Sequence, residues 1–373
     1  MNQNILSKSG LVFTGLTVGI LLWGCADSLG DLHRPPDEVF SIKRGTNISH
    51  WLSQSNRRGE ERKAWFTKKD VEYLAGLGFD HIRIPIDEEQ MWDEQGNKEP
   101  EAFQLLSQAL DWCAGYDMRA IVDLHILRSH HFNQGDRPLW TQPEAQEQFY
   151  QNWHDLSEAL KNRPVEMVAY ELMNEPVADD PEDWNELVAR AIYLIRESEP
   201  DRIIFIGSNR WQSASTFDQL KVPEDDPYIY LSFHMYEPFA LTHHQASWTG
   251  IRDYDGPVRY PGITVTEEDL DPFPENIKAI MQSHIRYYDK ETMIEHIQKP
   301  LNLAAKTGLP LYCGEWGCLP TVPEKDRLQW YADFKSVLED HNIAWTTWDY
   351  KGGFGIIDAA GNQRQQLIEV LTR

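Results

Sequence analysis

Several common signatures are missing from this chain of 373 residues. It holds four cysteines, and neither a Cys-x-x-Cys nor a His-Glu-x-x-His pattern occurs, so no metal site is indicated. No Gly-x-Gly-x-x-Gly or Walker loop follows the first predicted strand, which argues against nucleotide binding. Internal repeats and low-complexity blocks are also absent. The sequence therefore predicts a protein that uses neither a metal nor a cofactor.

Basic residues are scarce: 35 Lys and Arg stand against 59 Asp and Glu, which gives a formal net charge of -24. A protein with that charge repels polyanions, so nucleic acids and anionic membrane surfaces are disfavoured as partners, whereas a neutral substrate is tolerated. The 14 Trp and 15 Tyr can supply stacking surfaces, although a large core also buries many aromatic rings.

The N-terminal apolar run is too short for a comfortable transmembrane helix of about 20 residues. Residues 11–24 follow Lys8 and end in Leu22-Trp-Gly-Cys25, a pattern that resembles the signal peptide and lipobox of bacterial lipoproteins. We therefore expect a lipoprotein-type signal peptide at 1–25, a lipid on Cys25 and a linker at 26–40. An uncleaved anchor helix is the alternative. Either arrangement predicts an extracytoplasmic protein of a bacterial cell envelope, at the outer membrane or the cell surface, that touches the membrane only through this anchor.

Three cysteines remain beyond Cys25, and an odd number argues against a full disulfide framework. Cys313 falls in a predicted strand and Cys113 in a predicted helix, which favours buried thiols. A disulfide between Cys313 and Cys318 is the alternative, although disulfide geometry is demanding.

Short apolar segments alternate with amphipathic helical patterns from residue 42 to the end. Eight strands are predicted: Ser41–Asn47, His81–Pro85, Arg119–Leu124, Met167–Asn174, Arg202–Ile206, Tyr228–Phe233, Pro310–Gly314 and Ile343–Trp348. The predicted helices are Thr67–Leu77, Glu101–Tyr116, Pro143–Lys161, Asp183–Ser198, Lys290–Thr307, Glu324–Asp340 and Asn362–Arg373. Apolar strands that alternate with helices are typical of a parallel sheet covered on both faces, and eight of them favour a closed barrel over an open doubly wound sheet. We therefore predict a single (β/α)8 TIM barrel over residues 41–373.

The connection after the sixth predicted strand is unusually long, about 55 residues from Met235 to Asp289, and rich in aromatic and acidic residues. Loops of that length in a compact domain tend to be lids or binding walls. Because this loop leaves the rim where barrel active sites lie, a functional role is favoured over a surface excursion.

Two glutamates stand where an apolar strand is predicted to meet a loop. Glu175 precedes Pro176, and Glu315 lies two residues before Gly317. A carboxyl group in such a place is desolvated on one side and open to a ligand on the other. Two of them facing one cleft are what cleavage of a glycosidic bond requires.

Further polar and aromatic residues end the other predicted strands. These are Arg83, His125, Asn174, His234, Tyr236 and Trp348. One such residue alone is most often structural, but their joint placement at one rim indicates an active site.

The segments around these residues resemble those of glycoside hydrolase family 5, retaining barrel enzymes with catalytic acids on strands 4 and 7. The matching pieces are Arg44-Gly-Thr-Asn-Ile, His81-Ile-Arg-Ile-Pro85, Val122-Asp-Leu-His125, Asn174-Glu-Pro176, His234-Met-Tyr236, Gly314-Glu-Trp-Gly317 and Trp348-Asp-Tyr-Lys-Gly-Gly-Phe-Gly355. They lie in the expected order over residues 42 to 373.

The resemblance implies that Glu175 is the general acid/base and Glu315 the nucleophile. Arg83 and Tyr236 would hold Glu315 ionised, and Glu175 would keep its proton until transfer.

By the same resemblance, Asn174 would bind the sugar 2-hydroxyl, and His125 and His234 would orient substrate and carboxyl groups. Trp348 would be the stacking floor at the cleavage point.

Two further acids share the inward direction of the rim residues. Glu171 has the strand parity of Glu175, so it is either a third catalytic acid or, as we favour, a buried partner for Arg83. Asp123 has the parity of His125, and we expect a structural or supporting acid there.

Binding residues are predicted from the loops. The stretch from Tyr236 to Trp248 resembles a loop of bacterial family members that act on β-glucans. Candidate sugar contacts are Trp248 and Trp211, followed by His243, Trp51 and Trp316, and for each of them packing in the core is the alternative. The pair His130-His131 lacks further ligands for a metal, so rim contacts to sugar or solvent are favoured.

The predicted function is hydrolysis of a β-1,4-glucan, as by a cellulase or endo-β-glucanase, with a monomer acting on a poly- or oligosaccharide. Alternatives are a β-mannanase or a xyloglucan or mixed-linkage glucanase. A glycan-binding lipoprotein without activity is disfavoured, because both acids are present.

Overall fold

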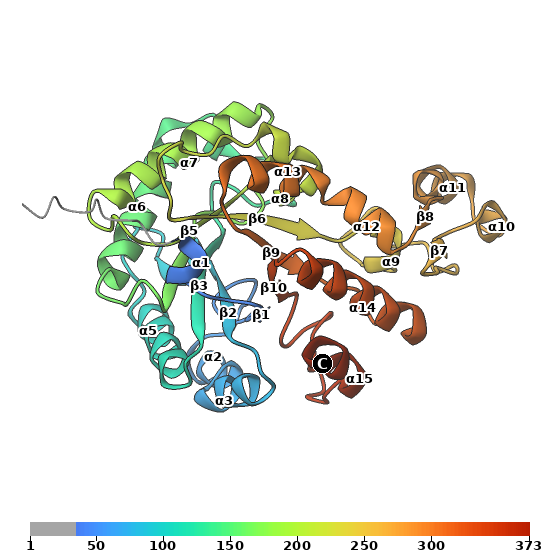
Figure 1. Ribbon diagram of the computed structural model, residues 1–373, viewed down its shortest axis with the longest axis horizontal. Coiled ribbons are helices and arrows are strands. Elements are labelled where there is room, and N and C mark those ends of the chain that lie inside the picture. Colours follow the sequence, from blue (N-terminus) through green and yellow to red (C-terminus); the bar gives the residue numbers. More distant parts are fainter. Residues whose placement is uncertain (1–34) are drawn as a thin grey trace, which may run out of the picture. The chain divides into compact units, whose positions relative to one another are not determined.

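Eight parallel strands close into a barrel in the computed structural model, which describes residues 35–373 (Figure 1). The strands are β1 (Arg44–Asn47), β2 (His81–Asp87), β3 (Arg119–Ile126), β4 (Val168–Glu171), β5 (Ile204–Gly207), β6 (Ile229–Met235), β9 (Leu311–Trp316) and β10 (Ala344–Thr347). They neighbour one another in chain order, and β10 returns to β1 through the pairing of Trp345 with Arg44. The predicted (β/α)8 barrel is confirmed.

Helices cover the outside of the barrel, and their apolar faces bury the strands. The long ones are α3 (Lys68–Gly76), α5 (Pro100–Gly115), α6 (Pro143–Leu160), α7 (Pro181–Arg196), α13 (Gln298–Thr307), α14 (Glu324–Asp340) and α15 (Gln365–Thr372). Shorter ones are α2 (Gly59–Trp65), α4 (Glu88–Met91), α8 (Asn209–Gln212), α12 (Lys290–His296) and the 3₁₀ helices η1 (Pro138–Trp140) and η2 (Ala214–Gln219). The single helix predicted over Lys290–Thr307 is two helices, because Pro300 is tolerated only in the first turn of a new one.

The ends of two strands that carry candidate residues differ from prediction. Strand β4 ends at Glu171 instead of Asn174, and Glu175 has a φ of 46°, a left-handed value that takes it out of the ladder. Strand β9 continues to Trp316, because β6 pairs with Glu315 and Trp316 after a bulge. Glu315 therefore lies within a strand, where it pairs with His234 of β6.

The barrel domain begins before residue 41. Helix α1 (Pro36–Val39) leads to Phe40, which is fully buried, packs edge-on against Phe205 and accepts a hydrogen bond from the Tyr230 hydroxyl through its carbonyl oxygen at 2.9 Å. The last residues of the predicted linker 26–40 are thus part of the packed domain. The predicted signal peptide 1–25 and the lipid site Cys25 lie outside the described residues.

The long connection after β6 forms a small structure of its own. It contains α9 (Phe239–Thr242), β7 (Gly262–Ile263), α10 (Glu267–Leu270), α11 (Glu275–Met281), the 3₁₀ helix η3 (Gln282–His284) and β8 (Tyr287–Tyr288). Strands β7 and β8 pair antiparallel, outside the barrel sheet. In Figure 1 this insertion, in yellow and orange, extends from the end of β6 that leads to α9.

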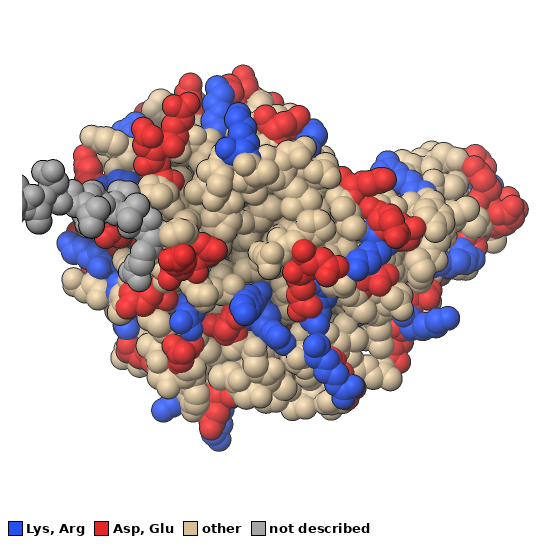
Figure 2. Space-filling model, in the orientation of Figure 1, with Lys and Arg blue, Asp and Glu red and all other residues tan. Residues whose placement is uncertain are grey.

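Charges of both signs are interspersed on the face shown in Figure 2, and acidic side chains gather at the far end of the insertion, where α10 carries three acids in its first turn. Within residues 35–373, none of the helices combines the length and the apolar character needed to cross a membrane. Cys113, Cys313 and Cys318 are free and buried, so the alternative of a Cys313–Cys318 disulfide is wrong and the prediction of buried thiols is confirmed.

The packing of Phe40 predicts that the N-terminal boundary matters for stability. Replacing Phe40 by Ala should lower the free energy of unfolding by about 3–5 kcal/mol, because the ring leaves a cavity against Phe205. The exposed Asp37 on the same helix is the control, and Asp37→Ala should change it by less than about 0.5 kcal/mol. Urea unfolding measures both. Equal stability of the two variants would show that α1 is not part of the folded unit.

Candidate active site

Glu175 and Glu315 face the same cavity, which has a volume of about 670 Å³. Glu175 follows β4 and Glu315 lies in β9, yet a carboxylate oxygen of one is within 4.8 Å of a carboxylate oxygen of the other. Retaining glycosidases hold their two carboxyl groups about 5–5.5 Å apart, and inverting ones about 6.5–9.5 Å apart. The closeness of the two carboxyl groups therefore fits the shorter separation of retaining enzymes, in which one carboxylate attacks the sugar directly.

Glu315 is stabilised as a carboxylate by two donors. Arg83 Nη1 donates to its Oε1 at 2.8 Å, and the Tyr236 hydroxyl donates to its Oε2 at 3.0 Å. Burial raises the pKa of Glu315, but the Arg83 charge and the Tyr236 hydrogen bond oppose that rise.

Glu175 has weaker support for a negative charge. Its Oε1 lies 2.9 Å from Nδ1 of His234, a histidine whose pKa burial holds well below its ordinary value, so that the ring is neutral. Burial first, and then the nearby charge of Glu315, raise the pKa of Glu175 well above its usual range. Glu315 therefore ionises first, and Glu175 keeps its proton.

The same groups are spaced closely enough to be considered as metal ligands, since one ligand atom from each of Glu175, His234 and Glu315 lies within 4.8 Å of the others. Both oxygens of Glu315 are already engaged by Arg83 and Tyr236. The arrangement thus favours proton chemistry between two carboxyl groups over metal binding.

Arg83 occupies the centre of the site, fully buried. Its N–H groups point at oxygens of five residues: Glu171 (2.6 Å), Asn47 (2.9 Å), Glu315 (2.8 Å), Asn174 (3.0 Å) and Asp123 (3.0 Å). Burial alone would lower the pKa of Arg83, but the surrounding carboxylates raise it well above its ordinary value. The prediction that Glu171 is a buried partner of Arg83 is confirmed, and Asp123 is a further supporting acid.

His125 and Trp348 form one stacked pair on the cavity wall, with ring centroids 5.5 Å apart and an interplanar angle of 4°. Nδ1 of His125 lies 2.7 Å from Asp123 Oδ2, which fixes the ring. Burial lowers the pKa of His125 to about 3, so this histidine is a neutral hydrogen-bonding group.

Two large aromatic rings line the cavity while remaining open to solvent. Trp211 is 44% exposed and Trp248 is 56% exposed. The indole N–H of Trp211 donates to the carbonyl of Phe132 at 3.1 Å, which fixes the ring plane. Trp211, Trp248 and His243, which the sequence analysis named as candidate sugar contacts, all line the cavity.

Other predicted contacts lie elsewhere. Trp51 and Trp316 are fully buried: Trp51 donates to the carbonyl of Arg62 and Trp316 packs in an aromatic cluster, so for these two the alternative of core packing holds and not the sugar contact. His130 is buried as well, and its Nε2 accepts a hydrogen bond from the backbone of Val177, so it supports the loop after Glu175 instead of lying at the rim. Loop tryptophans that fill a core and those that face a cleft have the same local sequence pattern, because the difference lies in the tertiary packing.

Several cavity residues were not predicted at all. They are His50, Gln54, Phe132, Asn133, Phe239, His296 and Phe354. His50, Gln54, Phe132 and Asn133 come from loops whose course the sequence does not determine, and His296 ends α12. Phe239 and Phe354 lie within segments that the resemblance had singled out, although neither residue was named as a contact. In the structure, the positive φ values of His50 (56°) and Gln54 (50°) mark the loop after β1 as one held in an uncommon conformation.

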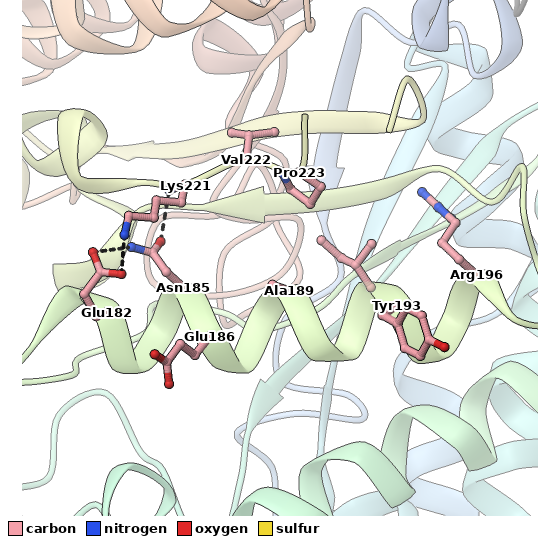
Figure 3. A pocket seen from close by; sticks show the side chains of 10 residues that line it. Glu182, Asn185, Glu186, Ala189, Tyr193, Arg196, Lys221, Val222 and Pro223 are labelled. Carbon is pink, nitrogen blue, oxygen red and sulfur yellow. Dashed lines mark hydrogen bonds and ion pairs between the residues drawn. The ribbon is translucent and has the colours of Figure 1, made fainter. Parts of the chain in front are cut away.

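A second hollow, of about 560 Å³, runs along α7 (Figure 3). Its walls are side chains of α7 and of residues 221–223, and Lys221 pairs with Glu182 across one end at 2.6 Å. None of the predicted site residues lies there. This hollow is a groove of the barrel exterior and not the active site.

A closed barrel whose rim holds two close glutamates, one favoured as the carboxylate and the other as the protonated acid, is the arrangement of a glycoside hydrolase. The comparisons agree: residues 44–353 match the model of the cellulase family, glycosyl hydrolase family 5, and the chain belongs to that family. Endoglucanase C of Acetivibrio thermocellus is 30% identical over 345 residues, covering 90% of this chain and 99% of the relative. Cellodextrinase A of Ruminococcus flavefaciens is 29% identical, with coverages of 81% and 84%. Among solved structures, endoglucanase Cel5A of Thermotoga maritima has a TM-score of 0.72 at 23% identity, covering 91% of this chain and all of the other.

The Tyr236 hydrogen bond predicts a change in pH dependence. In Tyr236→Phe the ionised form of Glu315 loses a donor, so the pKa of Glu315 should rise and the acid limb of kcat/KM should move to higher pH. Activity on the acid side should fall by roughly tenfold, as expected for loss of a hydrogen bond to a charged group. The exposed Tyr193, replaced by Phe, is the control. An acid limb that stays in place would contradict this role of Tyr236.

Proposed function

We propose that this protein is an endo-acting β-1,4-glucanase that cleaves its substrate with retention of configuration. The observation that carries the proposal is the buried glutamate pair, close enough for double displacement and placed in surroundings that favour ionisation of Glu315 and protonation of Glu175.

In the proposed first step, Glu315 attacks the anomeric carbon while Glu175 gives its proton to the glycosidic oxygen, which leaves with the first product. In the second step, Glu175 accepts a proton from water, and the water oxygen displaces Glu315 from the sugar. Asn174 supports this chemistry, because Arg83 engages its Oδ1 while its buried Nδ2 has no hydrogen-bond partner among residues 35–373. That N–H donor is free for the sugar 2-hydroxyl, a contact that strengthens in the transition state.

A neutral β-glucan is the substrate that the site and the relatives favour. Trp348, Trp211 and Trp248 offer apolar faces on which pyranose rings can stack, and the net charge of -24 disfavours anionic glycans. The relatives carry the names endoglucanase and cellodextrinase. A β-mannan is the second candidate, because the Thermotoga maritima Cel5A has also been solved with mannotriose. Xyloglucan and mixed-linkage glucan remain alternatives.

Replacing Glu315 by Gln tests the proposal. Reducing-sugar release from cellulose fragments, mixed-linkage glucan, xyloglucan and mannan should be highest on a β-1,4-glucan for the wild type, and should fall by roughly 10³-fold or more in Glu315→Gln. Binding of cello-oligosaccharides, measured by calorimetry, should persist in that variant. The exposed Glu197, replaced by Gln, is the matched control and should keep full activity.

Two outcomes would sink the proposal. One is unchanged turnover in Glu315→Gln, which would exclude it as the nucleophile. The other is an inverted anomer as the first product in an NMR time course, which would exclude double displacement. Binding of glucan with no hydrolysis by the wild type would instead support a carbohydrate-binding lipoprotein.

We also propose that Cys25 carries a lipid that anchors a monomeric enzyme at the outside of a bacterial cell envelope. The support is the Leu22-Trp-Gly-Cys25 pattern after an apolar run. The wild type should incorporate labelled palmitate and partition into the detergent phase, whereas Cys25→Ser should do neither. Cys113→Ser, which changes a buried thiol, is the control. Labelling of Cys25→Ser at the wild-type level would refute the assignment.

A further inference from the structure

Three consecutive residues of α8, the short turn after β5, have left-handed backbone conformations. Arg210, Trp211 and Gln212 have φ values of 59°, 62° and 50°, which are disfavoured for residues that carry a Cβ. Such conformations persist only where the surrounding structure enforces them, and they gather at functional sites. The turn is therefore a candidate for a specific task.

The turn sends neighbouring side chains in opposite directions. Trp211 faces the cavity, and its backbone N–H donates to the carbonyl of Pro176 at 3.2 Å, next to Glu175. Gln212 is fully buried inside the barrel, and its Nε2 donates to Glu171 Oε1 at 2.9 Å. One short turn thus carries both Trp211, a candidate sugar contact on the cavity wall, and Gln212, which contacts Glu171 inside the barrel.

The contact made by Gln212 leads to the proposed nucleophile in two further hydrogen bonds. Glu171 Oε2 accepts from Arg83 Nε at 2.6 Å, and Arg83 Nη1 donates to Glu315 Oε1 at 2.8 Å. Oε1 of Glu171 has one other contact among residues 35–373, the longer one from Ser232 Oγ at 3.3 Å. Gln212 is therefore the closest donor to that oxygen and helps fix the plane of the Glu171 carboxylate, which is one of the five groups that orient the Arg83 guanidinium.

Strand β5 leaves room for this side chain. A Cβ at Gly207 would lie 2.5 Å from Cγ and from Nε2 of Gln212, so a larger residue could not stand there without moving the amide. This close approach of Gly207 to Gln212 is an observation separate from the backbone conformation of the turn. Strand β5 and the turn thus both accommodate the same position of the Gln212 side chain.

We propose that Gln212 is a positioning residue for the nucleophile: through Glu171 and Arg83 it holds Glu315 in the direction of attack. The proposal rests on the proposed function and adds to it a residue with no contact to substrate. It also predicts that substitutions of Trp211 and of Gln212 have separable effects, because Trp211 contacts the sugar and Gln212 does not.

The formation of the covalent intermediate tests this role directly. With an activated 2-deoxy-2-fluoro-β-cellobioside, Glu315 forms an ester bond to the anomeric carbon while the leaving group departs, and mass spectrometry follows the trapped enzyme. Gln212→Met keeps the side-chain length but removes the amide, and should lower the trapping rate constant about tenfold with little change in inactivator affinity. Gln219→Met, the same change at an exposed position of η2, should trap within about twofold of the wild type.

The variant Gln212→Glu should show a pH-dependent trapping rate, which a merely structural role of Gln212 would not produce. A protonated carboxyl group can donate to Glu171 Oε1 as the amide does, whereas an ionised one repels it. The trapping rate of Gln212→Glu relative to the wild type should therefore fall as the pH rises. Wild-type trapping by Gln212→Met, or a relative rate of Gln212→Glu that does not change with pH, would overturn the proposal. A wild type that is never trapped would contradict the proposed double displacement instead.

Discussion

The arrangement of the site depends on one buried guanidinium group. Arg83 is the cation among the carboxylates of Asp123, Glu171 and Glu315, and a buried charge is stable only if it is paired and hydrogen-bonded. Because all of its N–H directions are taken, the group has a single orientation, and five residues in or just after four other strands, β1, β3, β4 and β9, are held relative to it. The unequal ionisation of the two glutamates follows, since Arg83 contacts Glu315 and not Glu175.

The chemistry and the selection of substrate come from different parts of the fold. Strands and the residues that follow them supply the charged groups. Loops supply further parts of the cavity wall, with His50 after β1, Trp211 after β5 and Trp248 after β6. Changes at His50 or Trp248 can alter which glycan enters without disturbing the glutamate pair, as is general for barrels of this kind. The turn after β5 is different, because it also carries Gln212, which we propose positions Glu315.

The sequence was sufficient for the features that follow from local pattern. Alternating apolar strands and helices predicted the barrel, and the polar residues that end the strands identified Arg83, Glu175 and Glu315 as neighbours. It was insufficient where packing between distant segments decides. Strand β4 ends at Glu171, three residues earlier than predicted, Pro300 divides a predicted helix, and Trp51 is buried while Trp211 is exposed. Gln212 has no local signal, because its importance arises from a turn and from a space beside Gly207 that exist only in the folded barrel.

The state of the three buried cysteines has a consequence for their reactivity. Cys113, Cys313 and Cys318 are free thiols, and burial raises the pKa of Cys113 and of Cys318 to about 12. Thiolates are the reactive form of cysteine, so these thiols resist both oxidation and exchange as long as the barrel stays folded. A thiol reagent that labels them therefore reports the opening of the barrel core.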